Sequence, residues 1–407
     1  MTRQPDAPMH VPGGVAAPRG FRAAGVACGI KKNDRPDLAL LVSDVEAAAA
    51  GVVTTNRIKA APVLVDQARL RRGRARAVVI NSGCANACTG APGLDDAKAM
   101  TAETARALGL DEADVLVAST GVIGARLPMD RVRGGIARAA AQLSPGGGPA
   151  AAAAILTTDT LPKEVALRET TGRVSITVGG MAKGSGMIHP QMATMLAFIT
   201  TDAAVAPQAL QAALKRVTTA TFNTIDVDGE TSPNDLVLCL ANGQARNSPI
   251  VSGPALARFE ALLHLLCERL ALLIVRDGEG ATKLVTLRVI GAANAAAARR
   301  VLLAVARSPL VKTAWHGEDA NWGRTLSAIG AAGVPIRPDR IGLRIGPVAV
   351  VRGGIGMGVS AEAEAAIILK QREFAVIVDL GQGRAEAVLR TCDLSEDYVR
   401  INASYRS

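Results

Sequence analysis

A short apolar run at residues 195–199 constrains this chain most, because it directly follows a glycine-containing polar segment and a junction of two small residues, Ala193-Thr194. A run of this length, bounded by turn residues, is typical of a strand that is buried on both faces. We therefore predict that Thr194 stands at the mouth of a buried strand.

A threonine in that place, preceded by a small residue, suits self-processing chemistry. Its hydroxyl can attack the carbonyl carbon of Ala193 and convert the amide to an ester, which water then cuts. The amino group freed on Thr194 becomes the base for the same hydroxyl. A structural interpretation stays open at this point, because most threonines at the start of a strand have no catalytic role.

The composition is that of a soluble globular protein, with 49% hydrophobic and 20% charged residues. Aromatic residues make up only 2%, so we expect a core of Ala, Val, Leu and Ile. A length of 407 residues predicts two or three domains, or one large two-part sandwich. The N-terminus lacks the apolar core of a signal peptide, and no uncharged apolar stretch reaches about 18 residues, so we expect no membrane span.

The charge balance is basic, with 46 Lys and Arg against 36 Asp and Glu and a net charge of +10. The densest basic cluster, residues 69–76, has no interleaved aromatics, so we expect a solvated turn and no nucleic-acid partner. A positive field could also attract acidic metabolites. The six cysteines are sparse, which is typical of reduced thiols in the cytoplasm, and Cys84 and Cys88 have no second pair to complete a zinc site.

Strands and helices alternate along the chain. We expect strands at 77–80, 115–118, 236–240, 283–290, 340–345, 348–351, 373–379 and 384–390, and a half-exposed strand through Val174, Ile176 and Val178. Helices are expected at about 95–108, from 129 onward, and at 150–156, 207–217 and 254–273, with Asp95 or Asp96 capping the first. This alternation predicts an α/β protein whose sheets are covered by helices.

Two segments supply groups that acyl transfer needs. Ser119-Thr120-Gly121 combines a hydroxyl with backbone N–H groups at a glycine turn, and such donors can stabilise an oxyanion, although the same sequence is common in ordinary loops. Lys183-Gly184-Ser185-Gly186 is not a phosphate loop, because its lysine precedes the glycine. We interpret it as a close approach of backbone to a small substrate, with Lys183 as the charge partner.

Three further groups stay open between function and structure. Glu279 lies in a glycine-rich turn, where its carboxylate could hold a substrate ammonium group or face solvent. His189 is either an acid–base group or a loop histidine bonded to backbone. The segment 316–319, His-Gly-Glu-Asp, would need two or more further ligands to bind a metal, so no metal is predicted.

Taken in order, these pieces resemble the ornithine acetyltransferase (ArgJ) family, whose bifunctional members are also N-acetylglutamate synthases. The resemblance covers almost the whole chain, through residues 20–26, 54–56, 81–83, 86–90, 119–124, 183–188, 192–196, 228–232, 315–324 and 401–403. It implies a layered α/β sandwich of the DmpA/ArgJ-like type. It also implies self-cleavage between Ala193 and Thr194 into an α chain, residues 1–193, and a β chain, residues 194–407.

The resemblance assigns roles residue by residue. Thr194 is the implied nucleophile, with its α-amine as the base, and Thr120 and Gly121 match the oxyanion hole. The implied substrate contacts are Thr157, Lys183, Thr194, Glu279, Asn402 and Ser407. The implied reaction is a ping-pong transfer of acetyl from N-acetylornithine to glutamate without a cofactor, in an α2β2 assembly. Use of acetyl-CoA as a second acetyl donor stays open.

The chain departs from the family pattern at three positions: Cys84, where asparagine is frequent, Ser407, where threonine is more frequent, and Pro233 in an acidic turn. Two other functions also stay open. A related N-terminal-nucleophile amidase or aminopeptidase would pass the acyl group to water. A non-catalytic basic binding module would remain one intact chain with salt-sensitive affinity for nucleic acid.

Overall fold

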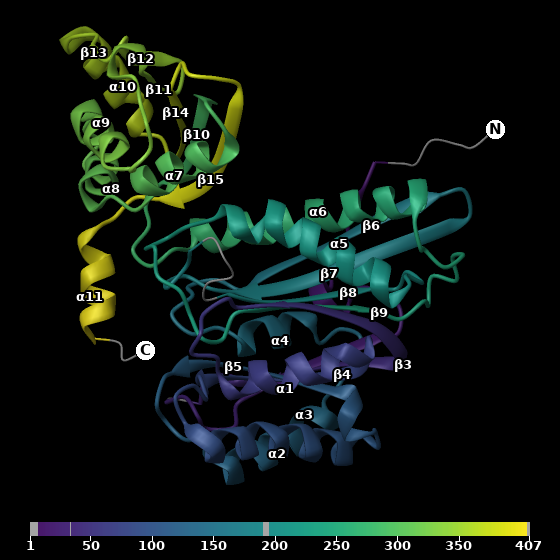
Figure 1. Cartoon of the computed structure of the whole chain (residues 1–407). Helices are drawn as coiled ribbons and strands as arrows, with labels where there is room; N and C mark the ends of the chain where they lie inside the picture. The colour runs from purple at the N-terminus through teal and green to yellow at the C-terminus, as the bar shows by residue number, and fades with distance from the viewer. Residues whose placement is uncertain (1–6, 33, 190–194, 405–407) are drawn as a thin grey trace. The chain divides into compact units, whose positions relative to one another are not determined.

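The predicted buried strand is present as β8, Leu196–Thr201, in which all six residues are buried (Figure 1). The computed structural model describes residues 7–32, 34–189 and 195–404. The chain divides into two compact units. The first runs to Asn223 and includes Glu230–Ile274, whereas the second contains Thr224–Gly229 and Val275–Tyr405. The predicted cleavage point at 193/194 therefore falls inside the first unit.

In the described part of the first unit, nine strands form one sheet in the order β1-β6-β7-β8-β9-β3-β4-β5, with β2 paired to β3. β8 is parallel to β9 and β4 is parallel to β5, while the other neighbours are antiparallel. The bounds are β1 Met9–His10, β2 Phe21–Val26, β3 Leu38–Val53, β4 Arg74–Cys84, β5 Val115–Val122, β6 Lys163–Thr171, β7 Val174–Lys183 and β9 Leu236–Ala241.

Helices cover this sheet in layers. The cluster of α1 (Ala61–Arg69), α2 (Gly90–Leu108) and α3 (Met129–Ala141) packs on one face of β2 to β5. The short α4 (Gly148–Ala154) lies in a second core with residues of β3, β4, β8 and β9. Figure 1 shows α5 (Pro207–Ala220) and α6 (Gly253–Arg276) on the face of β7 to β9 that is opposite α4. The predicted layered α/β fold is confirmed.

The prediction of a half-exposed strand at β7 is correct only for its first three residues. Val174–Ile176 are partly exposed, but the rest of β7, as far as Lys183, is buried. Covering layers explain the difference, because a Cβ on Gly180 would lie 2.9 Å from Leu270 of α6, and one on Gly179 would lie 2.1 Å from the Gly14 carbonyl oxygen. Alternation along a strand cannot reveal a second layer packed on the polar-looking face.

The predicted start of α2 near Asp95 was too late, and neither Asp95 nor Asp96 caps the helix. The helix begins at Gly90, and Pro92 stands in its first turn, where the missing N–H breaks no helical bond. Asp96 is instead buried and accepts a hydrogen bond from Arg126 Nε at 2.8 Å. The predicted end at Leu108 is confirmed.

The described part of the second unit contains a six-stranded sheet, in the order β13-β12-β11-β14-β10-β15. Trp315 packs edge-on against Phe374 in its core, with ring centroids 6.5 Å apart. The bounds are β10 Leu284–Ala292, β11 Gly342–Ile345, β12 Val348–Arg352, β13 Ile355–Gly356, β14 Glu373–Asp379, β15 Ala385–Cys392, α7 Ala295–Ala306, α8 Pro309–His316, α9 Trp322–Gly330, α10 Val359–Leu369 and α11 Glu396–Ser404.

Across residues 7–32, 34–189 and 195–404, no helix is both long enough and apolar enough to cross a bilayer.

Candidate active site

The predicted oxyanion loop lies where β5 ends beside β4. Thr120 and Gly121 belong to β5, and the register there is irregular, with Cys84 of β4 opposite both Thr120 and Val122. Gly121 has a φ of 125°, and a Cβ on it would lie 2.5 Å from the carbonyl carbon of Gly83. Only glycine therefore fits this position. Irregular pairing of this kind redirects backbone groups and is frequent next to active sites.

A buried asparagine that the sequence did not single out anchors this loop. Asn234 Nδ2 donates to the carbonyl oxygen of Ser119 at 2.8 Å and to that of Ala85 at 2.6 Å. Asn81 Nδ2 also donates to Ser119 Oγ at 2.6 Å. These bonds fix the residue that precedes Thr120. Asn234 lies in an irregular segment before β9, where no periodic pattern marks it as functional.

The residue after Asn234 holds the start of β8. Asp235 Oδ1 accepts a hydrogen bond from the backbone N–H of Met195 at 2.9 Å. Asp235 is fully buried, and burial raises the pKa of its carboxyl well above the ordinary value, although the Met195 N–H and Lys183 oppose the shift. The predicted cleavage site and two predicted contacts lie outside the described residues: Ala193, Thr194 and Ser407.

Two of the predicted substrate contacts meet at a buried carboxylate. Asp159 Oδ2 accepts a hydrogen bond from the backbone N–H of Thr157 at 3.0 Å and lies 3.8 Å from Lys183 Nζ. Asp159 Oδ1 lies 2.7 Å from Lys163 Nζ and accepts from the Gly184 N–H at 2.7 Å. Lys183 is the last residue of β7 and is buried, so it belongs to the sheet and is not an exposed loop lysine.

The same cluster controls how Asp159 titrates. Burial alone would raise the pKa of this carboxyl, but Lys183, Lys163 and the Gly184 N–H outweigh burial and hold the pKa well below its usual range. Asp159 is therefore ionised near neutral pH and keeps both lysine ammonium groups paired. No sequence motif indicated Asp159 or Lys163 as members of the site.

Lys31 is a further basic group near this cluster. Its Nζ donates to the carbonyl oxygen of Leu156 at 2.6 Å and to that of Pro36 at 2.8 Å. Burial lowers the pKa of Lys31 to about 8, and the charge of Lys183 contributes to the lowering. Leu156 directly precedes Thr157, so Lys31 supports the backbone next to a predicted contact. Its sequence surroundings carry no signal of this role.

In the second unit, the structure brings together two predicted contacts that are 123 residues apart. Asn402 Nδ2 donates to Glu279 Oε2 at 2.7 Å. Glu279 is only 9% exposed, so the alternative of a solvated carboxylate is wrong. The turn that carries it requires glycine, because Gly280 has a φ of 68° and a Cβ there would lie 2.6 Å from Tyr398 N.

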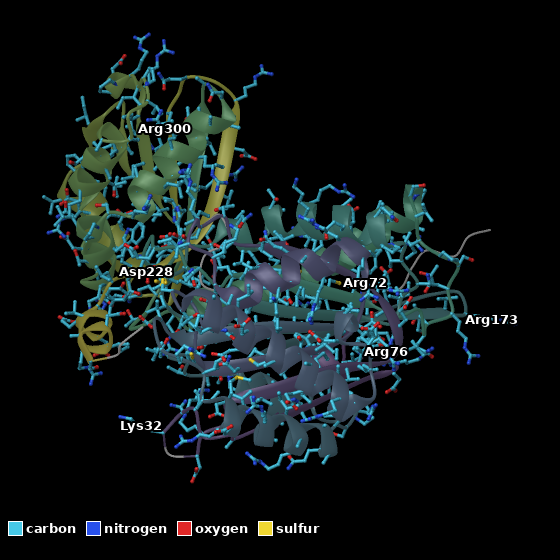
Figure 2. The ribbon with its side chains drawn as sticks, turned by 60° about the horizontal axis from the view of Figure 1, so that its bottom comes forward. Lys32, Arg72, Arg76, Arg173, Asp228 and Arg300 are labelled. Carbon is cyan, nitrogen blue, oxygen red and sulfur yellow. The ribbon has the colours of Figure 1, made fainter. Side chains whose placement is uncertain are left out.

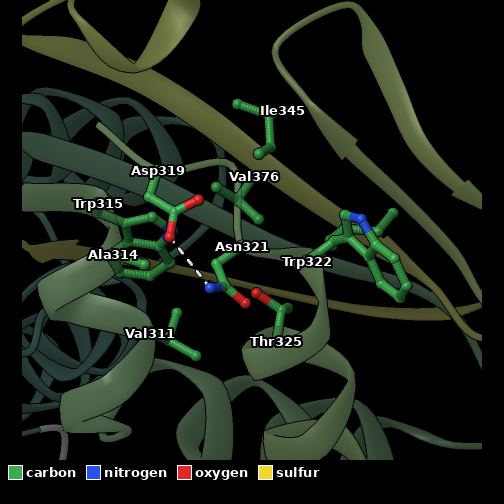
Figure 3. A pocket seen from close by; sticks show the side chains of 10 residues that line it. Val311, Ala314, Trp315, Asp319, Asn321, Trp322, Thr325, Ile345 and Val376 are labelled. Carbon is green, nitrogen blue, oxygen red and sulfur yellow. Dashed lines mark hydrogen bonds between the residues drawn. The ribbon is translucent and has the colours of Figure 1, made fainter. Parts of the chain in front are cut away.

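The segment 316–319 has structural partners. Figure 3 shows Asp319 accepting a hydrogen bond from Asn321, at 3.0 Å, while Asn321 also caps α9. The adjoining cavity is about 10 Å³, which is room for about one water molecule. Among the residues that the structure describes, no group of three or more His, Cys, Asp or Glu side chains could hold a metal ion. His316 lies 2.8 Å from Asp393, and His189 is buried.

Basic side chains are spread over many elements, as the labelled Lys32, Arg72, Arg76, Arg173 and Arg300 illustrate (Figure 2). The densest cluster, residues 69–76, makes ion pairs with nearby carboxylates: Arg69 with Glu112 at 2.6 Å, and Arg72 with Asp114 at 3.1 Å. These ion pairs give the cluster a structural role.

Comparison with known proteins identifies close relatives over nearly the full length. A model of the ArgJ family matches residues 22–407. The arginine biosynthesis bifunctional protein ArgJ of Symbiobacterium thermophilum is 53% identical over 97% of this chain and 99% of its own length. That of Geobacter sulfurreducens is 51% identical over 96% of this chain and 99% of its own. A crystal structure of the Bacillus halodurans protein is 42% identical, covers 46% of this chain and 98% of its own, and has a TM-score of 0.43.

Proposed function

The chain belongs to the ArgJ family, and from that premise we propose that it transfers an acetyl group from N-acetylornithine to glutamate. It is an acyltransferase of arginine biosynthesis, the pathway for which its relatives are named. The observation that carries the proposal is the anchoring of two predicted parts of the site by consecutive residues. Asn234 binds the carbonyl oxygen before Thr120, and Asp235 binds the N–H of Met195, which follows Thr194.

The reaction has two halves. After cleavage between Ala193 and Thr194, the free α-amine of Thr194 takes the proton of its own hydroxyl, which attacks the acetyl carbonyl of N-acetylornithine. An unperturbed α-amine has a pKa of roughly 7.7–8.0, which suits a base near neutral pH. Thr120 and Gly121 stabilise the oxyanion, the amine protonates departing ornithine, and the amino group of glutamate then takes the acetyl group from Thr194.

The remaining contacts position the substrates. Both substrates carry an α-carboxylate, which Lys183 binds. Asp159 contacts both Lys183 and the backbone of Thr157, and so positions these two residues for substrate binding. Glu279, supported by Asn402, binds a substrate ammonium group. Ser407 completes the set of contacts. The cycle requires no cofactor, and acetyl-CoA could serve as a second acetyl donor to the same threonine.

The location and assembly that we propose follow from the chemistry of the chain and its family. All six cysteines are free, which favours the reducing cytoplasm. The α and β chains are products of one precursor, and we propose that two of each form the active assembly. The expected partners are small-molecule substrates.

Self-processing and the nucleophile are tested together. The purified, denatured protein should give two masses, for residues 1–193 and 194–407, whereas Thr194→Ala should give one mass and no transfer of acetyl from N-acetylornithine to glutamate. Thr201→Ala, a change of another buried threonine in β8, is the matched control and should still be cut. A processed and active Thr194→Ala variant would remove Thr194 from the mechanism.

The amidase alternative predicts a different product. An acetyl-enzyme protected from water should release little acetate when glutamate is absent and should form N-acetylglutamate when it is present. Rapid release of acetate that does not depend on glutamate would favour the amidase function.

A further inference from the structure

We propose that Asn234 and Asp235 form a positioning pair that ties the oxyanion loop, at Ser119, to Met195, the residue that follows the proposed nucleophile. The inference rests on the proposed function, since it assigns to these residues the alignment of Thr120 and Gly121 with Thr194. Neither side chain needs to touch the substrate. Each acts through a backbone group next to a residue that does.

Asn234 contributes as a donor. Its side chain is 5% exposed, and its one NH2 group uses both hydrogens, on the carbonyl oxygens of Ala85 and Ser119. These two acceptors lie after β4 and near the end of β5, so one amide ties together the two strand ends that form the irregular pairing at Gly121. The Asn234 backbone N–H is itself held by Ser232 Oγ at 3.1 Å.

Asp235 contributes as an acceptor. Its Oδ1 takes the Met195 N–H at 2.9 Å, and its backbone oxygen accepts from the Thr54 N–H at 3.0 Å. Because the nitrogen of Met195 is bonded covalently to the carbonyl carbon of Thr194, a restraint on this N–H acts directly on the nucleophile residue.

The hydrogen bonds of Asn234 and those of Asp235 come from neighbouring residues at the start of one strand. Asn234 and Asp235 are consecutive and lead into β9, whose Leu236 pairs with Leu196 of β8. The Leu236 N–H also donates to the carbonyl oxygen of Met195 at 3.2 Å. A shift of the loop relative to Met195 would therefore break side-chain bonds on one residue or the other. Displacement of a catalytic group by about 1 Å can cost about 10²-fold in rate.

Exchanging amide and carboxylate at the two positions gives a matched test, because the swaps are nearly isosteric but opposite in their predicted effects. Asn234→Asp removes both donors, so we expect kcat per processed chain to fall about 10²-fold while KM changes less than about threefold. Asp235→Ala removes the acceptor and should cause a similar fall. Asp235→Asn keeps an acceptor oxygen for Met195 and should recover most of the activity that Asp235→Ala loses.

Asn247→Asp is the control. Asn247 Nδ2 also donates to two carbonyl oxygens, those of Ala204 at 3.1 Å and Ser248 at 2.8 Å, but it lies beyond the opposite end of β8. The processed fraction is measured by intact mass, folding by thermal unfolding, and kcat and KM with N-acetylornithine and glutamate. We expect Asn247→Asp to keep wild-type kcat and KM.

The outcomes distinguish a failure of the positioning pair from a failure of the proposed acetyltransferase function. If the unchanged protein transfers acetyl and Thr194→Ala does not, but Asn234→Asp matches Asn247→Asp in kcat, the positioning pair is refuted and the function stands. If Asp235→Asn is as impaired as Asp235→Ala, an acceptor oxygen for the Met195 N–H is not what the position supplies, and the inference is overturned for Asp235. An unchanged protein that neither cuts itself nor transfers acetyl overturns the function itself.

Discussion

Asp159 shows how one residue supports several others at the candidate site. Its two oxygens hold the backbone of Thr157 and Gly184, the ammonium of Lys163 at 2.7 Å and, more loosely, that of Lys183 at 3.8 Å. Its loss would remove a counter-charge from two buried cations, which is costlier than losing a surface pair. The arrangement therefore couples the stability of the first unit to the position of a proposed substrate contact.

Asp159→Asn should lower the free energy of unfolding by about 3–5 kcal/mol near pH 7. The folded-state pKa of Asp159 lies below its unfolded value of about 3.9, so its stabilisation is present above about pH 4 and is lost as the pH falls further. The difference between the unchanged protein and the variant should therefore shrink in acid, as measured by urea unfolding at pH 7 and pH 3. Asp130→Asn, at a fully exposed carboxylate, should change stability by less than about 0.5 kcal/mol. An equal effect from both variants would contradict this account.

At the scale of elements, the end of β5 depends on backbone shape more than on side-chain chemistry. The irregular register between β4 and β5 places Gly121 against the backbone of Gly83, closer than any Cβ allows. Gly124 in the same loop also has a positive φ, of 81°, but a Cβ there would meet nothing within 4 Å. The two glycines therefore differ in contact while sharing a left-handed backbone.

Gly121→Ala should reduce acetyl transfer by about 10²-fold or more, since the loop must shift and an oxyanion donor is worth about 10²–10³ in rate. Gly124→Ala carries only the cost of its φ, about 1–3 kcal/mol of stability, and should keep most of the activity. Steady-state kcat and thermal unfolding of both variants provide the check. Equal kcat for the two would mean that the close approach at Gly83 does not shape the site.

At the scale of the whole molecule, the strand order interleaves the two proposed chains. β8 and β9 follow the proposed cut at 193/194, yet they lie between β7 and β3, which precede it. Six residue pairs join β7 to β8 and six join β9 to β3. Cleavage therefore leaves the hydrogen bonds across both boundaries of the sheet in place.

The cut fragments should stay together without any covalent link. We expect the processed protein to elute as one species in size-exclusion chromatography under native conditions, at the same volume as uncut Thr194→Ala. The two fragments should separate only in denaturant. Free α and β chains after dilution in native buffer would show that the strand pairs across the cut do not hold the fragments together.

Local pattern by itself determined much about this protein: the buried strand β8, most of the other strands, the helices α2 to α6, and the family blocks around Thr120 and Thr194. It did not indicate α1 or the helices α7 to α11 of the second unit. It missed β3, whose residues 47–50 are all alanine and favour a helix, because only pairing with β4 and β9 makes them a strand. The tertiary structure alone decided which distant polar groups meet, such as Asp159 with Lys183 and Asn402 with Glu279. Periodicity reports which face of an element is buried, but a hydrogen bond between residues 123 apart leaves no repeating trace in the sequence.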